Sequence, residues 1–235
     1  MIVGNDIGEI NVNIPNDAYN NYHDVPTFSA YLTIIVKDSS GRVLKVHQQK
    51  SHSPTANFIG LLLPITYYSN TNSAFTLTNT TGGTCNYKPG LGSSPEDIAY
   101  PNSNSNANHP TYLVMIQVGS GQQSNPSTAT SLAAPISNGT GAGQLIYGAP
   151  IIPLSFTVSG SIVFYHISEV VTNQSGNTIN VTEVGIITNI QIMIYYNTAS
   201  SNCGQLLVWY DVLSSPISIP NGGSIIIYYN FEVNP

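Results

Sequence analysis

Ser224–Val233, with the sequence SIIIYYNFEV, decides the fold class of this chain. Its apolar side chains recur at every second position, a period that places them on one face of a β-strand. These residues are Ile225, Ile227, Tyr229, Phe231 and Val233. The opposite face, which begins with Ser224 and Ile226, mixes polar and apolar side chains. We therefore expect one face to lie in a core and the other to be partly covered by a neighbour.

The residues before this stretch predict further strands. β-Branched and aromatic residues dominate them, and Gly, Pro, Asn and Ser separate them. Pro216–Ile219 and Ser224–Val233 flank the turn Pro220–Gly223, which predicts a terminal hairpin. The other strands expected in this half are Phe156–Val171, bent at Gly160, then Thr178–Gly185, Ile186–Tyr196 and Gln205–Leu213.

The N-terminal half predicts one hairpin, one helix and two shorter strands. Phe28–Lys37 and Arg42–Gln48 flank Asp38–Gly41, a turn closed by glycine. A short apolar helix is expected after Ser53 or Thr55 as the cap, with Pro54 at its first position and Pro64 at its end. The remaining strands are Ala74–Asn79 and Tyr112–Val118.

Many strands without a helical layer indicate an all-β protein, an antiparallel β-sandwich of the jelly-roll or immunoglobulin-like type. Residues 1–25 are expected to form an extended N-terminal arm, in which Ile10, Val12 and Ile14 alternate like a short strand. Residues 26–235 are expected to form a single sandwich domain. Its long polar loops are predicted near residues 80–110 and 119–145.

Charged residues make up only 7% of the 235 residues, against roughly 25% in ordinary soluble domains. There are 5 Lys+Arg and 11 Asp+Glu, and four of the basic residues lie within Lys37–Lys50. We interpret this cluster as the solvated face of a hairpin. Five basic residues neutralise few phosphates, so nucleic acid is not an expected partner. With so few groups to titrate, the melting temperature is expected to change little between about pH 3 and 7.

Neither a membrane span nor a secretory signal is predicted. The longest apolar runs, such as Ile59–Ile65, are far shorter than the ~20 residues that a membrane helix needs. The N-terminus has no basic region followed by an apolar run, the pattern of a secretory signal.

No motif predicts catalysis, a metal site or a cofactor. The five histidines form no metal-ligand pair, and phosphate-binding glycine loops are absent. The acids Glu169, Glu183, Asp211 and Glu232 match a glycosidase pair by residue type only. We therefore assign no catalytic, cofactor-binding or metal-binding residue and do not expect an enzyme.

Covalent modification has two groups of candidates. Cys85 and Cys203 form either one long-range disulfide or two unpaired buried thiols, and their spacing leaves both alternatives open. Four N-x-[ST] sequences make Asn79, Asn138, Asn173 and Asn180 candidate glycosylation sites. Asn138 and Asn173 lie in predicted loops or turns, where glycosylation is sterically allowed.

Three segments resemble one protein family. They are Thr182–Ile186 (TEVGI), Leu206–Val233 (LLVWYDVLSSPISIPNGGSIIIYYNFEV) and Ser51–Leu63 (SHSPTANFIGLLL). Together they resemble a β-rich domain of structural proteins from the virions of phages and archaeal viruses. Members usually carry Arg before the acidic residue that corresponds to Asp211. This chain has Tyr210 there, which removes the arginine that a salt bridge would need.

The resemblance implies a virion component, whether capsid, vertex, turret or fibre, that sits in the extracellular particle. Its implied partners are further copies of itself or other virion proteins, and an arm such as Met1–Val25 would add a strand to a neighbour's sheet edge. The Lys-poor composition, rich in Asn, Ser, Thr, Tyr and Ile, also resembles coat proteins of viruses that infect thermophilic, acidophilic archaea. Acid stability fits this setting, because amide and hydroxyl hydrogen bonds do not titrate.

The alternative function is a secreted or particle-surface adhesin, a carbohydrate-binding β-sandwich module. Its 15 tyrosines and Trp209 would supply stacking surfaces, and its asparagines would bind the hydroxyl groups of a host-surface glycan.

Overall fold

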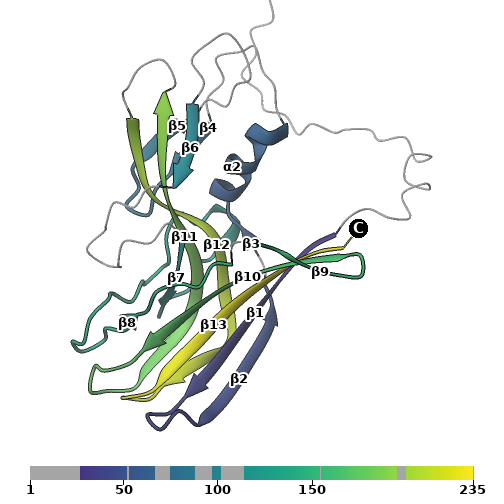
Figure 1. The fold of residues 1–235 in the computed structure, drawn as a ribbon. Helices are drawn as coiled ribbons and strands as arrows, with labels where there is room; N and C mark the ends of the chain where they lie inside the picture. The colour runs from purple at the N-terminus through teal and green to yellow at the C-terminus, as the bar shows by residue number, and fades with distance from the viewer. Residues whose placement is uncertain are drawn as a thin grey trace, which may run out of the picture.

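Two antiparallel β-sheets pack face to face, with a small third sheet and a helix at one end (Figure 1). The computed structural model describes residues 27–51, 53–66, 75–87, 97–101, 114–153, 155–194 and 200–234. The predicted arm, residues 1–25, lies outside these ranges. The predicted antiparallel β-sandwich is confirmed, while the jelly-roll and immunoglobulin-like alternatives stay predictions.

The first sheet has six strands in the order β2-β1-β13-β10-β8, with β9 also paired to β10. The central pair joins β1 to β13 over eleven residues of each strand, from Thr27 opposite Asn234 to Lys37 opposite Ser224. The strands are β1 (Thr27–Lys37), β2 (Val43–Lys50), β8 (Ile146–Tyr147), β9 (Thr157–Ser159), β10 (Ile162–Thr172) and β13 (Ser224–Asn234).

The second sheet has five strands and is built around β11. One side of β11 pairs with β12, which also pairs with β3, and its other side is shared by β6 and β7. The strands are β3 (Ser53–Pro54), β6 (Asp97–Pro101), β7 (Val114–Gly119), β11 (Ile179–Ile194) and β12 (Ser200–Ile219).

A small cap covers one end of the two sheets, opposite the turn between β1 and β2 (Figure 1). It contains α2 (Ala56–Thr66) and the pair β4 (Phe75–Thr78) and β5 (Thr84–Tyr87). The strand predicted over Ala74–Asn79 is thus confirmed as β4. Asn57 ties the helix to β4, because its amide donates to Thr78 O at 2.8 Å and accepts from Thr78 N at 3.0 Å.

The alternation predicted for Ser224–Val233 is confirmed in the first part of β13, whereas near its end Phe231 is half-buried and Val233 is 38% exposed. Ile225, Ile227 and Tyr229 are fully buried, while Ile226 and Tyr228 on the other face are half-buried. The core receives side chains from both sheets, and its fully buried members include Leu32, Ile34, Val181, Val184, Leu206, Ile217 and Ile219. Burial of these apolar groups is the main favourable contribution to folding.

The predicted terminal hairpin is wrong. β12 and β13 do not pair with each other: β12 belongs to the second sheet and β13 to the first. The turn Pro220–Gly223 therefore carries the chain between sheets, held by the bond from Gly222 N to Asn173 O at 2.7 Å. The sequence pattern of strand, turn and strand is the same whether the two strands pair as a hairpin or lie in different sheets. Which of the two forms depends on the strands elsewhere in the chain with which each one pairs.

Three element boundaries also differ from those predicted. Gly160, with a φ of +61°, forms the turn between β9 and β10 and is not a bend inside one strand. The two strands expected over Thr178–Tyr196 are the single strand β11, whose register shifts between Ile186 and Ile187. The single strand β12 likewise contains both of the strands expected over Gln205–Leu213 and Pro216–Ile219. A strand continues through a register shift or bulge, so such an irregularity does not end it.

The helix begins directly after Thr55, one of the two expected cap residues, and Ile59 N donates to Thr55 O at 3.2 Å, but the helix ends later than predicted. Pro54 lies in β3 opposite Trp209, so it does not occupy the first helical turn. Thr55 does not cap the helix with its side chain, because its hydroxyl donates to Leu207 O of β12 at 2.6 Å. The helix continues two residues beyond Pro64.

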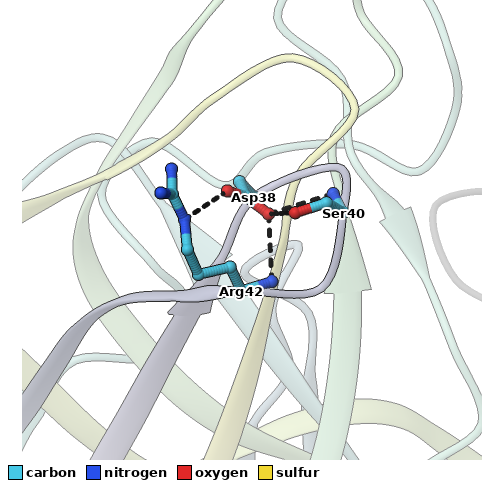
Figure 2. A network of polar contacts seen from close by, with 3 residues as sticks. All are labelled: Asp38, Ser40 and Arg42. Carbon is cyan, nitrogen blue, oxygen red and sulfur yellow. Dashed lines mark hydrogen bonds and ion pairs between the residues drawn. The ribbon is translucent and has the colours of Figure 1, made fainter.

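The turn between β1 and β2 is organised by the Asp38 carboxylate (Figure 2). Its Oδ1 accepts from the Ser40 hydroxyl at 2.6 Å, Ser40 N at 2.9 Å and Arg42 N at 3.0 Å. Arg42 Nε donates to Oδ2 at 3.0 Å. The Ser40 hydroxyl is the main cause that lowers the pKa of Asp38 to about 2. Desolvation partly opposes this shift, and the remaining donors add to it.

We predict that the Asp38 contacts stabilise the turn fully above about pH 4 and lose this effect as the pH falls through about 2. The sign follows because the unfolded carboxyl, with a pKa of 3.8, binds its proton first. The melting-temperature difference between the native chain and Asp38→Asn should therefore disappear below about pH 2. In Ser40→Ala the loss should be complete at a higher pH, because the pKa of Asp38 in the folded chain is lowered less. A difference that is constant through this range would contradict the assignment.

Candidate interaction surface

Three of the four acids named as candidates are internal hydrogen-bond acceptors. Glu169, Glu183 and Asp211 are 0–1% exposed, whereas Glu232 is half-buried on the outer face of the first sheet. Glu169 Oε2 accepts from Ile116 N at 2.7 Å. Within the described ranges, no group of three or more His, Cys, Asp or Glu residues is placed to hold a metal ion.

Glu183 joins a long loop to the second sheet. Its carboxylate accepts from Gly121 N at 3.2 Å, Ala133 N at 2.9 Å and Ala134 N at 2.8 Å. The Tyr210 hydroxyl donates to the same group at 2.7 Å. Burial, and to a smaller extent Glu183 itself, raises the pKa of Tyr210, so this hydroxyl stays protonated as a donor. A neutral donor therefore stands where the resemblance places Arg.

The loop predicted near residues 119–145 is packed and not merely polar. Ala129 and Leu132 are buried in a cluster on the outer face of the second sheet. Gly185 makes room for it, because a Cβ there would lie 2.6 Å from Leu207 Cδ1 and 3.0 Å from Leu132 Cδ2. In the sequence, the signal of this packing is the short apolar run that begins at Leu132 within an otherwise polar segment. Glu183 and Gly185 of the TEVGI segment thus secure this loop.

A second buried polar chain follows β2. Trp209 Nε1 donates to the Ser51 hydroxyl, which donates to Asp211 Oδ2. Burial first, and Asp211 next, raises the pKa of Tyr229 well above its ordinary value. Ser51, Asp211 and Tyr229 are buried, and these contacts link the first sheet to the second.

Cys85 of β5 and Cys203 of β12 form a disulfide with a Cα–Cα distance of 5.4 Å. Of the two alternatives left open by the sequence, the structure shows the paired one. The bond links the small third sheet to the second sheet across 118 residues of sequence.

The four glycosylation candidates lie in different environments. Asn138 and Asn180 are exposed, and Asn79 is half-buried with its Oδ1 occupied by its own turn. Asn173 is 0% exposed, and its Nδ2 donates to Asn177 O at 2.7 Å and Ile219 O at 2.8 Å. The expectation that Asn173 is sterically open is therefore wrong, because the nitrogen that would carry a glycan is buried and used.

We predict that Asn173 stays unmodified in a glycosylating host, and that Asn173→Ala lowers the free energy of unfolding by about 2–3 kcal/mol. The loss arises because the buried Ile219 carbonyl and the partly buried Asn177 carbonyl lose their donor. Asn180→Ala is the matched control and should change stability by less than about 0.5 kcal/mol. Peptide mass spectrometry and urea unfolding measure both effects. A glycan on Asn173 in the folded protein would contradict the assignment.

The outer face of the first sheet carries a row of apolar side chains that crosses four strands. Val46 lies opposite Ile35, Ile35 opposite Ile226, and Ile226 opposite Val170. Val46 and Val170 are 54% and 40% exposed, and the two central residues are half-buried. We call these four residues the outer apolar row. Contiguous apolar side chains on a solvent face are candidates for an interaction surface.

The edge strand β2 extends this surface. It pairs with β1 on one side and, within the described residues, with no strand on the other. Val43 and Leu44 on it are 51% and 49% exposed. Arg42, Lys45 and Lys50 are exposed on the same hairpin, as the sequence predicts.

A separate apolar recess of about 330 Å³ opens between the two sheets near α2. Trp209 is one of its lining residues, and the rings of Phe28, Phe58 and Phe231 lie at centroid distances of 5.3–5.9 Å from the Trp209 ring. Its lining is almost wholly apolar, so it fits an apolar side chain better than a polar substrate.

Comparison with known proteins adds no relative: no family model, no curated protein and no solved structure matches this chain. In the part of the chain that the structure describes, no helix combines the length and the apolar character needed to cross a bilayer.

Proposed function

We propose that this chain is a structural component of a virion that packs against further copies of itself or other coat proteins in the extracellular particle. The outer apolar row is the observation that carries the proposal. A folded domain gains nothing from leaving two exposed and two half-buried apolar side chains aligned on one face, whereas a neighbouring subunit would bury them. The resemblance of three segments to virion proteins supports the same role.

The internal architecture fits a particle that is exposed to the environment. A long-range disulfide and buried, hydrogen-bonded carboxylates stabilise the domain. Among the described residues, the surface ion pair is Arg42–Asp38 in the β1–β2 turn. Disulfides persist mainly in oxidising surroundings and in the proteins of hyperthermophiles. The same groups are occupied by structural contacts, so they support a non-enzymatic role.

Self-association of the purified chain tests this proposal. Val170→Lys places a charge in the outer apolar row and should abolish assembly, as measured by sedimentation and electron microscopy. Thr172→Lys is the matched control, since Thr172 lies two residues along the same face of β10 and should leave assembly largely intact. A native chain that stays monomeric at all concentrations and is absent from particles of its source would overturn the proposal.

One observation favours the alternative, a carbohydrate-binding surface. A shallow depression of about 400 Å³ on the first sheet is lined by Tyr31, Gln48, Lys50, Asn230 and Glu232. It combines an exposed aromatic ring with amide and charged groups, the groups that stack on and hydrogen-bond to sugars. Glycan-array binding that Tyr31→Ala removes would support this alternative, and an array without binding would exclude it for the glycans tested.

A further inference from the structure

The β2 edge is an open and firmly held template for another strand. Its eight residues have a partner only in β1 among the described residues. Gln49 fixes the strand to β12, since its Nε2 donates to Val212 O at 2.9 Å and its Oε1 accepts from Ser214 N at 3.0 Å. Exposed edges of this length pair readily with another chain unless charge prevents it.

The charge on this edge is of one sign. Residues 27–51 contain four of the five basic residues and one acid, Asp38. Arg42 is paired with Asp38. Lys45 and Lys50 have no acidic partner within the described residues, and Val43, Leu44 and Val46 lie exposed between and beside them. A complementary strand would therefore be acidic with alternating apolar side chains.

The chain contains a segment of that composition. Residues 1–26 hold four acids, Asp6, Glu9, Asp17 and Asp24, and no Lys or Arg. Within them, Glu9–Ile14 reads EINVNI, with apolar residues at every second position. We infer that the Glu9–Ile14 segment of a second copy adds to the edge of β2 as a further strand. Its apolar face would continue the outer apolar row beyond Val46.

A second copy fits this pairing better than the same chain. Antiparallel pairs are the commoner kind. In the same chain, antiparallel addition would make residues 15–26 run back along the whole of β2, roughly 26 Å for eight residues. A second copy needs no return path. The inference rests on the proposed self-assembly and names the contact that drives it, a head-to-tail contact in which one copy's segment meets another copy's edge.

Charge exchange in the full-length chain tests the proposed attraction between the acidic Glu9–Ile14 segment and the basic edge of β2. Lys45→Glu should weaken self-association at least about tenfold, and Glu9→Lys in the same chain should restore it. Lys88→Glu is the matched control, because it makes the same charge change at the basic residue outside the hairpin. Raising the salt from about 0.1 to 1 M should weaken association of the native chain and leave Lys45→Glu little changed. Equal association of Lys45→Glu and Lys88→Glu would overturn the inference.

Cysteine cross-linking tests the pairing itself. Val46→Cys is combined with Ile10→Cys, Val12→Cys or Ile14→Cys and oxidised under mild conditions. At least one pair should give covalent dimers and larger species on a non-reducing gel. Loss of thiols without an increase in mass would show pairing within one chain and overturn the inference, as would the absence of any cross-link. If Val170→Lys still abolishes assembly in that case, the coat role stands and only this contact is wrong.

Discussion

Replacing Glu183 with Gln is expected to lower the free energy of unfolding by about 2–4 kcal/mol. The carboxylate accepts three backbone N–H groups and the Tyr210 hydroxyl, and it is 0% exposed. The glutamine amide keeps one acceptor oxygen, but its NH2 group replaces the other oxygen. This NH2 group is a donor, and it would face backbone N–H groups and a hydroxyl that are donors themselves. Urea unfolding measures the loss.

The site of faster proteolysis distinguishes loss of the Glu183 contacts from general destabilisation of the fold. Glu183 holds the loop by Gly121, Ala133 and Ala134, so limited proteolysis should cut within residues 121–134 faster in Glu183→Gln. Glu232→Gln is the matched control, since Glu232 is half-buried on the outer face of the first sheet. It should change stability by less than about 0.5 kcal/mol. Equal stability of the two variants would show that Glu183 is not the anchor.

Removing the disulfide is expected to cost about 4 kcal/mol, because the bond closes a loop of 118 residues and restricts the unfolded chain. For a chain of this size the melting temperature should fall by about 10 °C. The double variant Cys85→Ser/Cys203→Ser tests this by calorimetry. The melting temperature of native protein treated with a reductant should fall by a similar amount, since the reduced protein and the double variant lack the same covalent link.

Other contacts near the disulfide should keep the third sheet in place when the bond is removed. The third sheet is also held by the Asn57–Thr78 hydrogen bonds and by Thr80 N, which donates to Gln205 O at 2.8 Å. The double variant should therefore still fold at room temperature. A reduced protein, with both thiols verified by mass spectrometry, that melts at the native temperature would contradict the prediction.

Local sequence patterns anticipated much of the secondary structure. The β1–β2 hairpin, the alternation of β13 and the strand β4 follow from residue period and turn chemistry, which act over a few residues. The terminal hairpin was wrong because the same pattern allows β13 to pair with β1 and β10 instead of β12. Choosing among partners depends on contacts far apart in sequence.

The candidate surface was only partly predictable. The mixed face of β13 indicated a covered or contacting surface, but the outer apolar row needs the register of four strands. The roles of Glu183 and Asn173 were likewise hidden, because both residue types are usually exposed and only tertiary burial makes them anchors.

By itself, the sequence determined the all-β class, the scarcity of charge and the concentration of basic residues at one hairpin, since period and composition are local properties. Only the tertiary structure decided that Ser224–Val233 lies at the centre of the first sheet, that Cys85 meets Cys203, and that one face aligns Val46 with Val170. The physical reason is that strand pairing joins residues through backbone hydrogen bonds that any sequence of suitable period can form. Register and partner are therefore set by the whole core and not by one segment.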